Sequence, residues 1–280
     1  MAQHPFWAKF VPLRFRKSVP VVHLVRLTGT IGVGSPLKPP ITFKDANEVL
    51  ERAFRKGIAA VALGINSPGG SAVQSSLIHA RIRALAAEHG IPVYVFCEDV
   101  AASGGYWLAC AGDEIYADES SVVGSIGVIS AGFGFVEAIA KLGIERRVHT
   151  AGENKSILDP FKPEKPEDVD RLLSLQTDVH AAFKALVRER RGSKLKGEET
   201  ELFSGAFWAG RQALERGLID GIGHMHEILR AKFGEKLVIR LIGPRQGWGL
   251  RRLGLGSATD LSDSFIASLE TRALWRRFGL

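Results

Sequence analysis

Apolar and polar residues alternate along the first half of the chain in blocks that predict a strand followed by a helix, several times over. Residues 19–27, 58–65 and 91–97 are apolar and rich in β-branched side chains, which is typical of strands buried on both faces. Helical spacing of apolar residues follows in 42–56 and 71–89. This order predicts right-handed crossovers and a largely parallel sheet, with the functional loops at the carboxyl ends of the strands.

The second half continues the pattern with shorter predicted strands and a long helix. Strands are predicted at 114–116, 122–129, 144–150 and 236–242, and helices at 133–142, 167–191, 209–216 and 224–233. Prolines interrupt residues 157–166, which we expect to form a loop over the site. The pattern therefore predicts one α/β domain over 19–242, between a basic and aromatic extension at 1–18 and a tail at 243–280 with a helix at 261–278.

Composition adds that the chain is an ordinary globular protein with a basic surface. Its 280 residues are 45% hydrophobic and 24% charged, with a formal net charge of +7, and no apolar run is long enough for a membrane helix. Residues 1–18 lack the apolar core of a secretion signal, and their mixture of basic and aromatic side chains fits either a plain surface extension or contact with an anionic membrane surface. The charge is not clustered into a nucleic-acid motif, so no nucleic-acid partner is expected.

The chain has only two cysteines, and both lie in apolar runs. Cys97 and Cys110 therefore read as reduced core residues, with a disulfide or a metal pair as the weaker interpretation. Free thiols of this kind are usual in a reducing compartment. We expect a cytoplasmic location, including the cytoplasmic face of a membrane.

One serine stands where a buried strand meets a helix. Ser103 lies in VAASGGYWLA (100–109), and the two glycines after it leave room for a substrate backbone. A helix start offers unpaired N–H groups and a partial positive charge, which suit an atom that attacks a carbonyl and generates an oxyanion. Serine is also a favoured N-cap, so this stretch alone fits either a nucleophile or a helix cap.

A nucleophilic serine needs a base, and two residues compete for that role, one at the end of the predicted strand at 144–150 and one shortly after it. His149 is the histidine nearest the predicted active edge, and with Asp99 or Asp113 it would complete a triad. Lys155 follows in a short polar loop and precedes an apolar pair. Because desolvation favours the neutral form of an amine, we prefer Lys155 as the base.

The oxyanion needs backbone N–H donors, and glycines supply them at two turns. Gly69 and Gly70 follow the predicted strand at 58–65, and Gly104 follows the serine. The same glycines could instead make a plain tight turn. They lack the length and the lysine of a phosphate-binding loop, so no nucleotide site is predicted.

Five motifs in this order resemble the signal peptide peptidase A (protease IV) family of serine peptidases. They are NSPGG (66–70), AASGGY (101–106), GSIGV (124–128), GENK (152–155), and WAGRQA (208–213) with GLID (217–220). The resemblance covers about 19–242. It implies an α/β fold of the Clp/crotonase type, a repeated β-β-α superhelix with a largely parallel sheet, here with a helical C-terminal extension.

The resemblance also implies roles for individual residues. Ser103 matches the acylated nucleophile, Lys155 the general base, and Ser125 the serine whose hydroxyl helps to hold the lysine amine. The amide of Gly70 matches the oxyanion donor, with Gly104 as its companion. No metal or organic cofactor is implied.

Family members often carry an N-terminal membrane anchor, and we expect this single-copy short form to lack one. Members assemble into rings or domes, so a homo-oligomer is expected. The predicted reaction is hydrolysis of extended peptides or proteins, such as signal-peptide remnants or membrane-associated proteins. The small and apolar side chains of Ala102, Val122 and Ile126 predict a preference for small or aliphatic residues beside the cut.

Two other functions fit parts of the pattern. A crotonase-like enzyme acting on acyl thioesters would also place paired glycine amides at an oxyanion, but it needs a carboxylate pair that the sequence does not suggest. A catalytically silent scaffold could bind peptides or membrane proteins such as stomatin-like partners. The presence of Ser103, Lys155 and Ser125 together argues against the scaffold.

Overall fold

The structure is a computed structural model that describes residues 19–34, 39–244 and 272–279. Its eight strands are β1 (Val21–Thr28), β2 (Ala60–Ser67), β3 (Val93–Ala102), β4 (Glu114–Ala117), β5 (Val122–Gly124), β6 (Phe207–Ala209), β7 (Gly221–Ile222) and β8 (Val238–Leu241). Its helices are α1 (Phe43–Ala53), α2 (Ala72–His89), α3 (Gly104–Ala109), α4 (Val136–Lys141), α5 (Pro166–Arg191), α6 (Glu199–Leu202), α7 (Gly210–Glu215) and α8 (Met225–Phe233).

A single twisted sheet forms the body of the molecule, in the order β6-β5-β3-β2-β1-β8, with β4 paired to β3 and β7. Every pairing is parallel except that of β5 with β6. The mixed α/β fold with a mostly parallel sheet is thus confirmed. Because the strands are parallel, the turns after β2, β3 and β5 all reach the same edge of the sheet.

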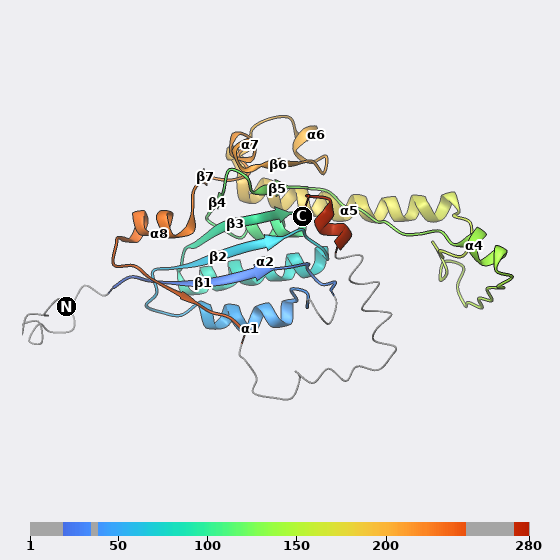
Figure 1. Cartoon of the computed structure of the whole chain (residues 1–280), viewed down its shortest axis with the longest axis horizontal. Coiled ribbons are helices and arrows are strands. Elements are labelled where there is room, and N and C mark those ends of the chain that lie inside the picture. Colours follow the sequence, from blue (N-terminus) through green and yellow to red (C-terminus); the bar gives the residue numbers. More distant parts are fainter. Residues whose placement is uncertain (1–18, 35–38, 245–271, 280) are drawn as a thin grey trace, which may run out of the picture.

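Helices cover both faces of this sheet (Figure 1). On one face α1, α2, α3 and α5 enclose the larger apolar core, which contains fully buried side chains from the central strands such as Leu63 and Val95. On the other face α8 covers a smaller cluster around Phe96 and Leu229. The central strands are apolar throughout because both of their faces are buried.

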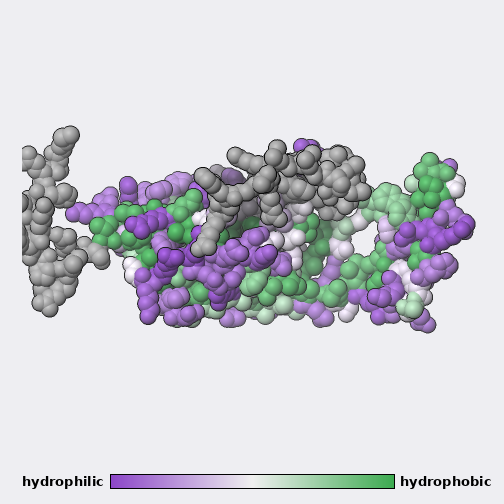
Figure 2. All heavy atoms as spheres, turned by 90° about the horizontal axis from the view of Figure 1, so that it is seen from below, coloured by the Kyte–Doolittle hydropathy of each residue, from purple (hydrophilic) through white to green (hydrophobic). Residues whose placement is uncertain are grey.

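The long helix α5 supports a projecting arm, residues 129–165, and brings the chain back from it to the sheet (Figure 1). The arm packs mainly on itself. The Phe135 and Phe161 rings stack with centroids 5.5 Å apart, Arg146 forms an ion pair with Asp159 at 3.0 Å, and the Phe135 amide donates to the Pro160 carbonyl. Hydrophobic side chains are nevertheless exposed along it (Figure 2), namely Ile129, Phe133, Phe135, Leu142 and Ile144.

Three predictions for this region are wrong. Residues 144–150 are irregular and exposed, because no neighbouring strand lies beside them in the described arm to pair with their backbone. The strand predicted at 122–129 ends at Gly124, where the chain bends at Ser125. The loop at 157–166 lies in the arm and does not cover the sheet edge in this copy of the chain (Figure 1).

Several predictions fall outside the described residues. The extension at 1–18 and most of the helix predicted at 261–278 belong to them, although 272–276 is helical. Among the helices that the structure does describe, none is both long enough and apolar enough to cross a bilayer.

A buried histidine makes the stability of this fold depend on pH. His79 on α2 is 7% exposed, and its Nε2 atom has no hydrogen-bond partner within the described chain. Burial lowers the pKa of His79 to about 4, and the charges of Arg190 and Arg83 act in the same direction. The folded protein therefore keeps this ring neutral, while the unfolded chain takes up a proton below about pH 6.5.

Lowering the pH from 7 to 4.5 is expected to reduce the free energy of unfolding by about 2 to 3 kcal/mol through His79 alone. The depressed pKa stabilises the fold above pH 6.5, and the benefit is lost as the pH falls toward 4. Urea unfolding of His79→Leu across this range should show a flatter pH dependence. The exposed His226 supplies the control, since His226→Leu should keep the wild-type slope. If the free energy of unfolding depends on pH equally steeply in both variants, His79 is not the group responsible.

Candidate active site

Ser103 occupies a strained turn between β3 and α3. Its backbone has φ 53° and ψ −121°, a conformation that costs a residue with a side chain about 1 to 3 kcal/mol. The Ser103 amide donates to the Gly124 carbonyl at 2.8 Å, which fixes the turn against β5. The hydroxyl makes no capping hydrogen bond to α3. The helix-cap interpretation therefore does not account for this side chain.

The glycine turn after β2 packs directly against the serine. A Cβ atom on Gly69 would lie 2.8 Å from both the Gly104 amide nitrogen and the Ser103 Cβ, so only glycine allows this approach. A Cβ on Gly70 would lie 2.1 Å from the Ile31 carbonyl oxygen. The Gly69 amide donates to Ser67 Oγ at 3.2 Å, which leaves Gly70 as the free donor of this turn. The first N–H groups of a helix lack partners within the helix, and the amide of Gly104 stands at this position at the start of α3.

Ser125 lies next to this turn, at the end of β5. Its φ is also 53°, its side chain is buried, and its amide donates to the Ala206 carbonyl at 2.7 Å. The preceding residue, Gly124, accepts the hydrogen bond from Ser103. The structure therefore brings together the serine, the glycine turn and Ser125 from three separate sequence motifs.

A cavity of about 200 Å³ opens beside Ser103, Gly70 and Gly104. Its other walls are mostly apolar and come from α3, α5 and the chain after β5: Trp107, Val128, Ile129, Val179 and Phe183. Two further wall residues, Leu274 and Arg277, belong to the C-terminal end of the chain. An apolar pocket with a few convergent polar groups is the usual form of a binding site.

The side chains that the sequence suggested for substrate contact are not the ones that line this cavity. Ala102 and Ile126 are fully buried inside the core, and Val122 faces a different cavity. Sequence reasoning instead missed Trp107, whose ring stacks on Phe183 with centroids 4.6 Å apart. The apolar periodicity of α5 contained Val179 and Phe183, but it could not show that they face the serine.

Lys155 is not placed beside Ser103 within one copy of the chain. It is exposed in the arm, and its described backbone contact is with Gly152 of the same turn. The arm meets α5 at Pro166, and Phe183, which packs on Trp107, lies about 25 Å further along that helix. The nucleophile and the predicted base are thus on two different parts of the molecule (Figure 1).

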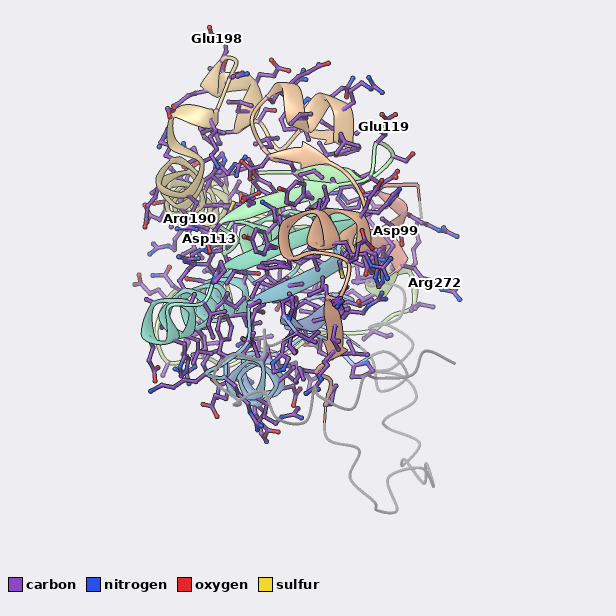
Figure 3. The ribbon with its side chains drawn as sticks, turned by 90° about the vertical axis from the view of Figure 1, so that its left-hand side faces the viewer. Asp99, Asp113, Glu119, Arg190, Glu198 and Arg272 are labelled. Carbon is purple, nitrogen blue, oxygen red and sulfur yellow. The ribbon has the colours of Figure 1, made fainter. Side chains whose placement is uncertain are left out.

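The alternative triad is not assembled either. His149 is exposed in the arm. Asp113 directly precedes β4, and its carboxylate accepts from the Val93 amide at the start of β3 at 2.8 Å and pairs with Arg83. Asp99 lies toward the other end of β3 and bonds to Asn66 at 2.6 Å. Figure 3 shows Asp99 and Asp113 on opposite sides of the molecule, so the two aspartates cannot serve the same site.

Within residues 19–34, 39–244 and 272–279, no cluster of metal-ligating side chains is present. The groups beside Ser103 are a hydroxyl, backbone amides and apolar walls. These groups suit nucleophilic attack on a carbonyl and stabilisation of the oxyanion that follows.

Comparison with known proteins identifies relatives along most of the chain. The model of Peptidase family S49 matches residues 86–237, more than half of the sequence. The chloroplastic serine protease SPPA of Arabidopsis thaliana is 33% identical over 72% of this chain, and Protease 4 of Haemophilus influenzae is 31% identical over 79%. A Brucella melitensis protein named Na(+)/H(+) antiporter NhaA is 50% identical over 97% of the chain.

The chain spans 30%, 35% and 39% of the lengths of the Arabidopsis, Haemophilus and Brucella proteins. Among solved structures, the 1510-N membrane-bound stomatin-specific protease in complex with a substrate peptide has a TM-score of 0.50 and 16% identity, and the match covers 90% of this chain and 99% of that one. This likeness confirms the type of fold. The family model and the relatives named as proteases show that the chain belongs to peptidase family S49.

Proposed function

We propose that this chain is a serine endopeptidase in which Ser103 is the nucleophile. The observation that carries the proposal is the strained Ser103 turn, whose uncapped hydroxyl borders an apolar cavity beside the amides of Gly70 and Gly104. A strained residue persists only where its surroundings impose it, and such residues gather at active sites. Membership of a peptidase family supports the same conclusion.

The reaction follows from these groups. Ser103 Oγ attacks the scissile carbonyl carbon, and its proton passes to the neutral amine of Lys155. The amides of Gly70 and Gly104 donate to the oxyanion. When the tetrahedral intermediate collapses, the lysine returns the proton to the leaving amine, and water then hydrolyses the acyl-enzyme by the same sequence of steps. Ser125 holds the lysine amine near Ser103.

We propose further that Lys155 reaches Ser103 from a neighbouring copy of the chain. The arm that carries Lys155 exposes Ile129, Phe133 and Leu142, which are 63%, 81% and 73% exposed in the single chain. Exposed apolar groups of this size mark interaction surfaces. Docking of the arm on a second sheet edge would bury them, and burial of the lysine favours its neutral form. A closed ring or dome of copies repeats this contact.

The cavity walls support a preference for small or aliphatic side chains beside the cut. The stacked rings of Trp107 and Phe183 form its floor with Val179 and Val128, and the volume of about 200 Å³ admits a side chain of modest size. The substrates are peptides or proteins in extended conformation. Signal-peptide remnants and membrane-associated proteins are apolar enough to suit these walls.

The two cysteines support a cytoplasmic location. Cys97 and Cys110 are free and buried, and burial raises the pKa of each thiol to about 12. Such thiols behave as core residues and persist in a reducing compartment. The antiporter activity in the name of the Brucella relative is not carried over, because the family match at 86–237 is to a peptidase. Family membership likewise does not favour an acyl-thioester enzyme.

The experiment that tests the proposed function is labelling with a fluorophosphonate probe. The native protein is expected to label, Ser103→Ala to lose all labelling, and Lys155→Ala to lose most of it, because the probe reports an activated serine. His149→Ala is the matched control in the same arm and should label normally. Labelling of Ser103→Ala at the native level would show that another residue reacts, and loss in His149→Ala alone would favour the triad.

A further inference from the structure

The C-terminal segment, residues 272–279, lies across the sheet edge that carries Ser103 (Figure 1). Residues 272–276 are helical and the chain turns through 279. Leu274 and Arg277 form part of the wall of the Ser103 cavity. Phe278 borders a second cavity of about 580 Å³ and packs edge to face on Phe207 of β6, with centroids 5.1 Å apart. The segment thus bridges two cavities.

The composition of the segment suits this position. Leu274 in the helical turn and Phe278 in the turn that follows it are both half-buried. Arg272, Arg276 and Arg277 make the segment strongly basic.

The second cavity has an acidic wall. Glu98, Asp99 and Asp118 line it together with Arg26, which pairs with Glu98 at 3.5 Å, and Figure 3 shows Asp99 and Arg272 on the same side of the molecule. The position of the segment against the two cavities and its basic charge therefore both favour binding of the segment at this edge of the sheet.

Leu274 also limits the space left for a substrate. The cavity beside Ser103 measures about 200 Å³, whereas ligand sites usually measure about 300 to 1,000 Å³. The cavity is small because residues of the segment close one side of it. A helical turn does not present an extended backbone to the serine, so the segment blocks the site without being a suitable substrate.

We propose that residues 272–278 are a built-in ligand of the groove over Ser103 and inhibit the enzyme by occupying the space of a substrate side chain. The inhibitory role rests on the proposed peptidase function, whereas binding of the segment does not.

Binding is tested first, without catalysis. A fluorescein-labelled peptide of residues 271–280 is mixed with a protein shortened to residues 1–270 that carries Ser103→Ala, and fluorescence anisotropy is recorded. Saturable binding is expected, and it should be about tenfold weaker for a peptide with Leu274→Asp. The matched control is Ala273→Asp, which adds the same charge at an exposed position. No binding, or equal effects of the two substitutions, would overturn the proposal.

Inhibition is tested on the active protein with a fluorogenic peptide. Shortening to residues 1–270, or Leu274→Asp in the full chain, should raise kcat/KM about tenfold, mainly through KM, because an attached competitor acts at a high local concentration. Added 271–280 peptide should restore competitive inhibition. Peptide binding without hydrolysis in any variant would sink the peptidase function and leave the ligand assignment standing. If shortening leaves hydrolysis unchanged, the inhibitory role of the segment is wrong and the peptidase function stands.

Discussion

Co-expressed Ser103→Ala and Lys155→Ala chains are expected to recover peptidase activity that neither variant has alone. Each single variant should retain less than about a thousandth of the native rate, because one lacks the nucleophile and the other its base. In a mixed assembly, a site is complete where an intact Ser103 meets an intact Lys155 from its neighbour. Random mixing makes about a quarter of the sites complete, a gain of several hundredfold over either parent.

The measurement is peptide hydrolysis by assemblies purified through two different tags, one on each variant. The matched control pairs Ser103→Ala with the double variant Ser103→Ala/Lys155→Ala, which assembles in the same way but offers no intact serine. If the doubly tagged assembly forms and remains inactive, the lysine does not come from a neighbour. The arm would then have to fold back onto its own sheet.

Replacing Asp220 by alanine is expected to lower the free energy of unfolding by about 3 to 5 kcal/mol. Asp220 pairs with Arg191, whose side chain is only 2% exposed, through contacts of 2.8 and 3.1 Å. The same carboxylate accepts from Lys194 at 2.7 Å and from the Ile115 amide at 2.8 Å. It therefore ties the end of α5 to β4, and its loss leaves the Arg191 charge buried without a partner.

The pKa of Asp220 reflects the opposing effects of burial and of these hydrogen bonds. Burial acts to raise it, but hydrogen bonds from Arg191 and Lys194 outweigh burial and hold the pKa below its usual range.

The matched control is Glu119→Ala, which breaks an exposed pair with Arg211 and should cost no more than about 1 kcal/mol. Denaturant unfolding compares the two. If Asp220→Ala proves too unstable to purify, Lys194→Ala keeps the Arg191 pair and should fold. A loss for Asp220→Ala no larger than for Glu119→Ala would contradict the assignment.

The sequence predicted the central sheet well because its strands are buried on both faces and therefore apolar throughout. The turns at Gly70 and Ser103 could be placed on one edge because parallel strands end together, and the structure has them in contact. Ser125 was matched to this site by its motif, and it lies at a bend where the strand ends instead of continuing to 129 as predicted.

The arm could not be predicted in the same way. Residues 144–150 carry apolar residues that would suit a strand, but a strand forms only where another lies beside it, and the pattern of one segment does not reveal its neighbours. The same limit applies to Lys155. Its spacing from Ser103 along the sequence does not show whether it acts at the site of its own chain or at that of a neighbouring copy. Trp107 and Phe183 were visible as apolar positions, yet only tertiary packing shows them as walls of a cavity.

The length of α5 has a geometric consequence for any assembly of this protein. As one unbroken helix from Pro166 to Arg191, it is about 39 Å long and sets the distance between the sheet and the arm. Each residue added to or removed from it would turn the arm by about 100° and shift it by about 1.5 Å. Adding or removing seven residues, about two full turns, would return the arm to within about 20° of its original direction. Under the proposed contact between copies, the length of α5 therefore sets both how far the arm reaches and in which direction it is presented.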